Sequence, residues 1–228
     1  MTFADKVIAF NTQLEYTGSL PDGIQIMNPF RENPSVLDLS SQFYHKFYAD
    51  NRPRRLILGI NPGRHGAGLT GIPFTDPKRL AEQCGIPFNG PKAHEPSSVF
   101  VYEVVAAYGG LEAFFGDFYI NSPCPLGFTK TNEQGKEVNY NYYDSKALTA
   151  AVYDFILDSM DKHLALGVRR DKAFCMGSGQ NFKFLDKLNR EKGYFDQLIP
   201  LEHPRFVMQY KSKEKLAYIE RYLELLAD

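Results

Sequence analysis

Short apolar runs alternate with longer amphipathic stretches along most of the chain, and this alternation predicts its secondary structure. The apolar runs have the continuous hydrophobicity of strands that are buried on both faces. The predicted strands are Leu56–Ile60, Phe118–Asn121, Lys172–Met176 and Leu198–Leu201. The predicted helices are Ala4–Leu14, Val36–Tyr48, Pro77–Cys84, Val99–Tyr108, Asp144–Leu164, a helix that follows Gly177-Ser178-Gly179 and runs through Asn189, and Lys213–Leu226.

Strands that alternate with helices favour an α/β fold. We therefore expect a three-layer α/β/α sandwich around a central, mostly parallel four-stranded sheet. Two segments are predicted to be loops: Pro21–Pro34 is rich in Pro, Gly and Asn, and Thr129–Tyr143 is polar and rich in Tyr. Because no repeat or low-complexity tract divides the chain, we expect a single domain over residues 1–228.

Polar side chains stand at or just after the ends of three predicted strands. Asn61 directly follows the first strand, Asn121 ends the second, and His203 comes shortly after the fourth. The carboxyl ends of parallel strands share one edge of a sheet, where open α/β sheets bind ligands. The sequence therefore predicts a binding or catalytic site at this edge.

The segment after the first strand, residues 61–74 (NPGRHGAGLTGIPF), is rich in glycine. Backbone with so few side chains lets a ligand approach closely. Asn-Pro-Gly is also a good turn in any protein, so the segment alone fits a plain strand-to-helix connection equally well. It matches neither the dinucleotide fingerprint nor the P-loop, which disfavours a dinucleotide or nucleoside triphosphate site.

Composition narrows the class of protein. The 228 residues are 43% hydrophobic and 23% charged, as in ordinary globular proteins. No apolar run is long enough to span a bilayer, and Met1–Leu20 lacks a signal-peptide core, so we expect no membrane partner. Cys84, Cys124 and Cys175 fit neither a disulfide framework nor zinc or iron–sulfur spacing, which favours a cytoplasmic location. With a net charge of −1, any nucleic-acid binding must come from a local patch.

The candidate residues also limit the chemistry. His203 is the strongest acid or base among them, and no carboxylate lies between Gly59 and Phe74, which disfavours a glycosidase with paired carboxylates. Ligands for a metal are too few, the G-x-S-x-G motif is absent, and no cofactor is expected. An aromatic ring, amides and a His around a glycine-lined pocket suit a planar, hydrogen-bonding ligand such as a nucleobase flipped out of DNA.

Three motifs, in this order, resemble those of the uracil-DNA glycosylase superfamily. Residues 59–63 (GINPG) with 70–74 (TGIPF) are similar to the first motif of its single-strand-selective monofunctional (SMUG) type. Asn121 with the C-P-L at 124–126 is similar to that family's strand end, N-x-C-P-L, and His203-Pro204 is similar to the start of its H-P-S motif. The resemblance spans residues 54 to 206, and a second, bacterial SMUG-like branch is the alternative to the main one.

The resemblance implies a monofunctional DNA glycosylase of base excision repair, which hydrolyses the N-glycosidic bond of uracil in DNA and acts as a monomer. Other deaminated or 5-modified bases fall within the expected range, since Gly63 stands where some members carry an excluding Tyr. Asn61 would orient the attacking water, and His203 would donate to O2 of the departing base. The remaining residues implied to contact the base are Gly59, Ile60, Pro62, Gly63, Phe74, Asn121 and Ser122.

Two departures from the family motifs bear on the site. One extra residue separates Asn121 from the C-P-L sequence, so Ser122 is expected to share the reading role. Arg205 and Phe206 replace the start of the family's S-P-R-N wedge, leaving Phe206 or Met208 to fill the gap of a flipped base. The cations expected to contact DNA phosphates are Arg205, Lys211 and Lys213, with Lys215 nearby.

Simpler readings of the same residues remain open at this level. Phe74 fits a core aromatic, His203 a buried turn residue, and the lysines a solvated helix start. A nucleobase-binding module without turnover would use the same pocket. A hydrolase of free nucleosides needs no grip on phosphates, so Arg205 and the lysines favour DNA over that class.

Overall fold

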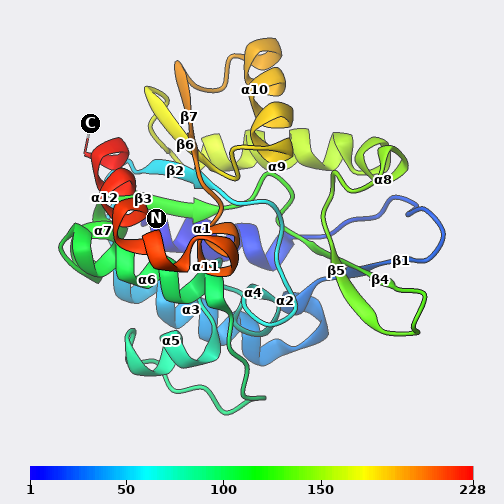
Figure 1. Cartoon of the computed structure of the whole chain (residues 1–228), viewed down its shortest axis with the longest axis horizontal. Helices are drawn as coiled ribbons and strands as arrows, with labels where there is room; N and C mark the ends of the chain where they lie inside the picture. The colour runs from blue at the N-terminus through cyan, green and yellow to red at the C-terminus, as the bar shows by residue number, and fades with distance from the viewer. Residues whose placement is uncertain (228) are drawn as a thin grey trace.

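Four parallel strands form the central sheet of the computed structural model, which describes residues 1–227 (Figure 1). Their spatial order is β3-β2-β6-β7 and every neighbouring pair is parallel, which confirms the predicted sheet. All of β3 and most of β2 and β6 are buried, which explains their continuous apolar runs. The strands are β2 (Arg55–Leu58), β3 (Phe118–Asn121), β6 (Lys172–Met176) and β7 (Gln197–Leu201).

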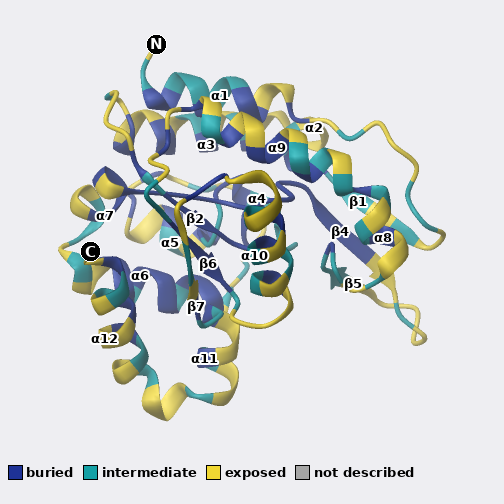
Figure 2. Cartoon of the chain, turned by 90° about the horizontal axis from the view of Figure 1, so that it is seen from above, coloured by how far each residue is buried: buried dark blue, intermediate teal, exposed yellow. Residues whose placement is uncertain are grey.

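Successive residues of β3 show that helices cover both faces of the sheet, as predicted. Tyr119 packs against Phe3 of α1 (Phe3–Gln13) and Tyr44 of α3 (Pro34–Phe47), with ring centroids 5.3 and 6.4 Å away. Phe118 points to the other face and meets Tyr108 and Phe114 of the helices α6 (Pro96–Tyr108) and α7 (Leu111–Asp117). Because side chains of a strand alternate between faces, these contacts define a three-layer sandwich (Figure 2).

The predicted helices are present, with one correction. The segment predicted as one helix over Asp144–Leu164 is two helices that meet at Val152, whose ψ of 7° departs from helical geometry. The other helices are α5 (Pro77–Glu82), α8 (Lys146–Ala151), α9 (Tyr153–Ala165), α10 (Gln180–Lys192), α12 (Lys215–Leu226) and the short unpredicted α2 (Pro29–Glu32), α4 (Ala67–Thr70) and α11 (Pro204–Tyr210), with a 3₁₀ turn at Ser212–Glu214.

A second, antiparallel sheet replaces both predicted loops, and that part of the prediction was wrong. It has the order β1-β4-β5 and lies to one side of the main sheet (Figure 1). Its strands are β1 (Ile24–Met27), β4 (Gly127–Thr131) and β5 (Glu137–Tyr140). β1 and β5 contain no fully buried residue, so they carry no clear hydrophobic pattern. Gly135, with φ of +71°, makes the tight turn between β4 and β5.

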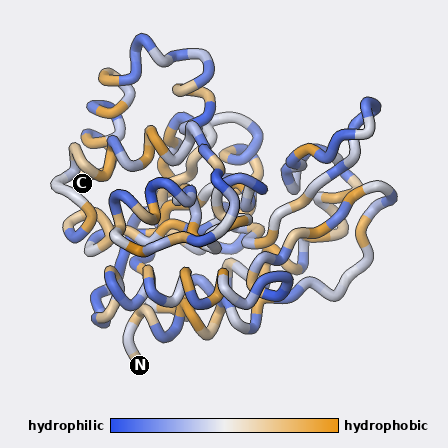
Figure 3. Tube along the Cα trace, turned by 90° about the horizontal axis from the view of Figure 1, so that it is seen from below, coloured by the Kyte–Doolittle hydropathy of each residue, from blue (hydrophilic) through white to orange (hydrophobic). Residues whose placement is uncertain are grey.

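The main hydrophobic core draws on elements from α1 to α12. Apolar and polar residues alternate along the helices beside the N-terminus (Figure 3), so each helix turns one side to this core. Within residues 1–227, no helix is by itself long and apolar enough to cross a membrane; α6 and α7 satisfy length and composition only as a pair bent by 95°.

Candidate active site

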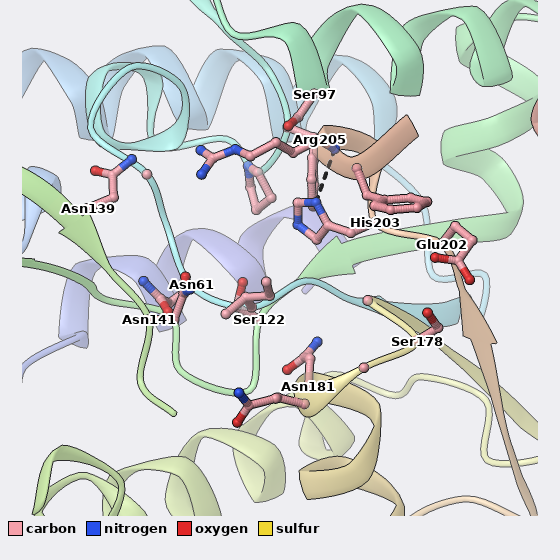
Figure 4. Close-up of a pocket in the computed structure, with 18 of the residues that line it drawn as sticks. Asn61, Ser97, Ser122, Asn139, Asn141, Ser178, Asn181, Glu202, His203 and Arg205 are labelled. Carbon is pink, nitrogen blue, oxygen red and sulfur yellow. Dashed lines mark hydrogen bonds between the residues drawn. The ribbon is translucent and has the colours of Figure 1, made fainter. Parts of the chain in front are cut away.

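A cavity of about 810 Å³ opens at the carboxyl ends of the parallel strands (Figure 4). The segments after β2, β3, β6 and β7 contribute to its wall, and so do residues around β5 of the second sheet. The predicted convergence of strand ends therefore occurs for Asn61 and His203, which both line the cavity. Ile60, Pro62 and Gly63 also lie on its wall, as predicted.

Asn61 is held by the backbone of the second sheet. Its Oδ1 accepts the Tyr142 N–H at 3.1 Å, and its Nδ2 donates to the Tyr140 carbonyl at 3.2 Å. A donor on one side and an acceptor on the other fix which end of the amide is oxygen. Since a carbonyl oxygen has two lone pairs, Oδ1 keeps one with which to accept from a water molecule.

His203 precedes α11 and is a neutral donor. Its Nδ1 accepts the backbone N–H of Arg205 at 3.1 Å (Figure 4), so the proton of the neutral ring is on Nε2. Burial, with the nearby Arg205 guanidinium as a smaller cause, lowers the pKa of His203 to about 4. The imidazole therefore stays neutral at physiological pH and offers one N–H.

Phe74 lines the cavity in a strained conformation. Its φ of +53° is the left-handed value that bulky residues seldom adopt. The ring centroid lies 6.0 Å from that of His203, and a Cβ on Gly59 would approach the Phe74 ring to 3.0 Å. Gly59 itself does not line the cavity; its lack of a side chain leaves room for the ring.

The structure brings Ser122 to the cavity but not Asn121. Asn121 is turned into the core, where its Nδ2 donates to the Tyr119 hydroxyl and its Oδ1 accepts the Ser122 N–H at 2.8 Å. Counting back from the C-P-L at 124–126, Ser122 is the residue at the position of the N in N-x-C-P-L. The extra residue thus moves the expected base-reading position by one.

The backbone of Ser122 is fixed from the opposite side by His163 of α9. Burial lowers the pKa of His163 to about 4, so this ring is neutral. Its Nε2 donates to the Ser122 carbonyl at 3.1 Å. Ser122 therefore presents its side chain to the cavity from an anchored backbone.

Asn181, at the start of α10, was not predicted and joins several segments of the wall. Its Nδ2 donates to the carbonyls of Gly59 and Met176, both at 3.0 Å, and its Oδ1 accepts the Tyr142 hydroxyl at 2.7 Å. The turn Gly177-Ser178-Gly179 was the only sequence signal near it. Asn139 and Asn141 line the cavity too, but they belong to the region mistaken for a loop.

The rim of the cavity carries an exposed aromatic pair. Phe206 and Tyr210 of α11 are 39% and 68% exposed, and their ring centroids are 5.7 Å apart. Arg205 shares the rim, and its side chain reaches over the cavity in Figure 4. Lys211 and Lys213 are not on the wall; the ammonium of Lys211 lies 3.0 Å from Glu214.

Among the described residues, no group of three or more His, Cys, Asp or Glu side chains could hold a metal ion. Most of the hydrogen-bonding side chains on the cavity wall are neutral amides and hydroxyls. The arrangement suits binding of a planar polar ligand between Phe74, Ser122 and His203, with a water molecule held by Asn61.

Comparisons with known proteins agree with this geometry. The model of the family described as the uracil DNA glycosylase superfamily matches residues 45–227. A solved structure titled "The crystal structure of WT Pedobacter heparinus SMUG2" is similar to the chain, with 58% sequence identity and a TM-score of 0.98 over 100% of this chain and 97% of that one. A comparison with curated proteins gave no match. The chain belongs to the uracil DNA glycosylase superfamily, as a member of its SMUG-like type.

Proposed function

We propose that this protein is a monofunctional DNA glycosylase that hydrolyses the N-glycosidic bond of uracil in DNA, as the first step of base excision repair. Membership of the superfamily and the similarity to SMUG2 support this activity. The observation that carries it is the pairing, in one cavity, of the backbone-held Asn61 amide with the neutral Nε2–H of His203.

Asn61 orients the attacking water. As the bond between C1′ and the base breaks, positive charge develops on the sugar and negative charge on the base, as in other glycosyl transfers. The free lone pair of Oδ1 accepts one hydrogen of the water and directs its oxygen toward C1′. Because the amide is held at both ends before substrate binds, little reorganisation is needed at the moment of reaction.

His203 stabilises the leaving base. Negative charge collects on O2 of uracil as the bond breaks, and a fixed N–H gains strength as that charge grows. A neutral imidazole gives this hydrogen bond without transferring its proton. The lowered pKa and the bond from Arg205 to Nδ1 both keep Nε2–H in place.

The base is recognised by stacking and a small number of polar groups. Phe74 provides the aromatic face, and the hydroxyl of Ser122 is able to donate one hydrogen bond to the base and to accept others from it. A serine reads fewer atoms of a base than an amide does. With glycine at position 63, we infer that the pocket accepts deaminated or 5-modified bases besides uracil.

Residues on the rim of the cavity are the ones proposed to contact DNA. Phe206 and Tyr210 are placed to fill the gap left by a flipped base, whereas Met208 is packed against the core. Arg205 binds a DNA phosphate in this proposal, and Lys211 and Lys213 extend the positively charged surface beside it. We further propose that the protein acts as a monomer in the cytoplasm, without metal or cofactor; the three buried, free cysteines are consistent with a reducing compartment.

A single experiment tests the function. The protein is incubated with a uracil-containing oligonucleotide and then with alkali, with Asn61→Ala as the matched variant. Strand scission at uracil, unaffected by excess chelator, is expected for the wild type; Asn61→Ala should be slower by roughly 10²–10⁴-fold with unchanged DNA affinity. Binding without release of uracil would show a non-catalytic module. Release from deoxyuridine alone would show a nucleoside hydrolase.

Ser122 and Asn121 form a matched pair for base reading. Ser122→Ala removes one hydrogen bond to the base and should lower the single-turnover rate on uracil DNA about tenfold, with little effect on stability. Asn121→Ala leaves the buried Tyr119 hydroxyl without its partner, so it should lower the free energy of unfolding by about 1–3 kcal/mol while the folded protein keeps its rate. The opposite pattern would return the reading role to Asn121.

His203→Ala should slow the chemical step by about 10²–10³-fold, as the removal of one preorganised donor does, with little change in the Kd for uracil DNA. Because the folded pKa is about 4, no step in the wild-type rate should arise from this imidazole near pH 6.5. Its contribution to stability is complete above pH 6.5, the unfolded value, and falls as the pH drops toward 4. A fully active His203→Ala protein would exclude the leaving-group role.

A further inference from the structure

Glu95 is a carboxylate on the cavity wall that the mechanism above does not use. It immediately precedes α6 and faces the glycine turn that follows Asn61. Its Oε1 lies 3.6 Å from the position that a Cβ on Gly63 would occupy, and a Cβ on Gly66 would collide with its carboxyl group. The side chain therefore fills space that these two glycines leave open.

Several contacts anchor Glu95 in this place. Its backbone N–H donates to Asp76 Oδ2 at 2.9 Å, and the hydroxyl of Ser98 donates to its Oε2 at 3.5 Å. Its Oε1 shares the space beside Gly63 with Asn139 Nδ2, which lies 3.3 Å from the same Cβ position. The Asn139 amide, a donor, and the Glu95 carboxylate, an acceptor, thus both lie beside Gly63 on the cavity wall.

The charged groups around Glu95 act in opposite directions. Burial raises its pKa, Arg205 on α11 lowers it, and Asp76 raises it. Arg79 pairs with the Asp76 carboxylate at 3.1 Å and so moderates its effect; the exposed side chain of His94 also faces this carboxylate, at 3.7 Å. A carboxylate with a raised pKa is a stronger base while it remains ionised near neutral pH.

The hydrolysis needs an acceptor for the proton of the attacking water. The Asn61 amide cannot take it, and both nitrogens of His203 are engaged, one carrying the proton and the other accepting the Arg205 N–H. Glu95 lies beside Gly63, which is two residues after Asn61. The Cα atoms of Asn61 and Gly63 are at most about 7 Å apart. A water molecule bound to the Asn61 side chain can span such a distance to the Glu95 carboxylate.

We propose that Glu95 is a further catalytic residue: the base that accepts a proton from the water held by Asn61. The oxygen of that water bonds to C1′, one of its protons passes to Glu95, and the electron pair of the glycosidic bond leaves with the base, whose O2 is held by His203. Glu95 then returns the proton to solvent. This inference rests on the proposed function.

Single-turnover rates between pH 4.5 and 8 test the proposal on the wild type, Glu95→Gln and, as a charge-matched surface control, Glu82→Gln; the ordinary glutamate pKa is 4.5. The wild-type and control rates should rise to a plateau with a midpoint above that value. Glu95→Gln should lower the plateau about 10²-fold and abolish the rise, with DNA affinity and thermal stability retained. Near-wild-type rates with the same rise in Glu95→Gln would overturn the proposal.

Two further measurements separate the alternatives. Formate should partly restore the rate of Glu95→Ala but not of Asn61→Ala, because a free carboxylate can replace a base but not an orienting amide; equal or absent rescue would count against Glu95. If the rise of the rate with pH were lost in Glu202→Gln but kept in Glu95→Gln, the proton acceptor would be Glu202, the other carboxylate on the wall. If the wild type released no uracil at any pH, the proposed function itself would fail. If the wild type released uracil and Glu95→Gln had the same kinetics, only the role of Glu95 as the proton acceptor would be excluded.

Discussion

The site depends on the pair of hydrogen bonds between the Asn61 side chain and the backbone at residues 140 and 142. They connect the loop after β2 in the parallel sheet to the end of β5 in the antiparallel one. Asn181 strengthens the same junction, because it links the carbonyls at the ends of β2 and β6 to the hydroxyl of Tyr142. The second sheet therefore fixes the orientation of the Asn61 amide, and a fixed dipole is what the proposed reaction needs.

Around this junction the cavity is built for charge separation. The residues that we propose to contact the base, Phe74, Ser122 and His203, are all neutral, so in this proposal a base with growing negative charge meets the N–H of His203. Burial keeps the imidazole neutral, and the Arg205 backbone determines which nitrogen carries its proton. The carboxylate of Glu95 lies instead beside Gly63 and Gly66, in the glycine turn after Asn61. In the proposed mechanism, the hydrogen-bond donor to the departing base and the proton acceptor for the water are thus two different groups of one pocket.

Much of this could be predicted from the sequence, and the failures have physical causes. The parallel sheet was predictable because strands buried on both faces leave continuous apolar runs, and Asn61 and His203 come shortly after the ends of two of these strands. β1 and β5 are half-exposed and show no such pattern, so the pair of hydrogen bonds that clamps the Asn61 amide was missed. In an extended segment a shift of one residue exchanges the side chain that faces the site, which is why Ser122 takes the place expected for Asn121. Glu95 reaches the cavity only through tertiary contacts.

The single-turnover rate of Asn61→Asp on uracil DNA at neutral pH tests the central role of this clamp most directly. An aspartate is the stronger base, but its second oxygen would face the Tyr140 carbonyl, the acceptor that now lies 3.2 Å from Asn61 Nδ2. Two acceptors repel, so the carboxylate would turn away and lose the geometry that directs the water. The clamp predicts a rate well below that of the wild type. A rate equal to or above the wild type would contradict it, because basicity rather than the held orientation of the amide would then limit the reaction.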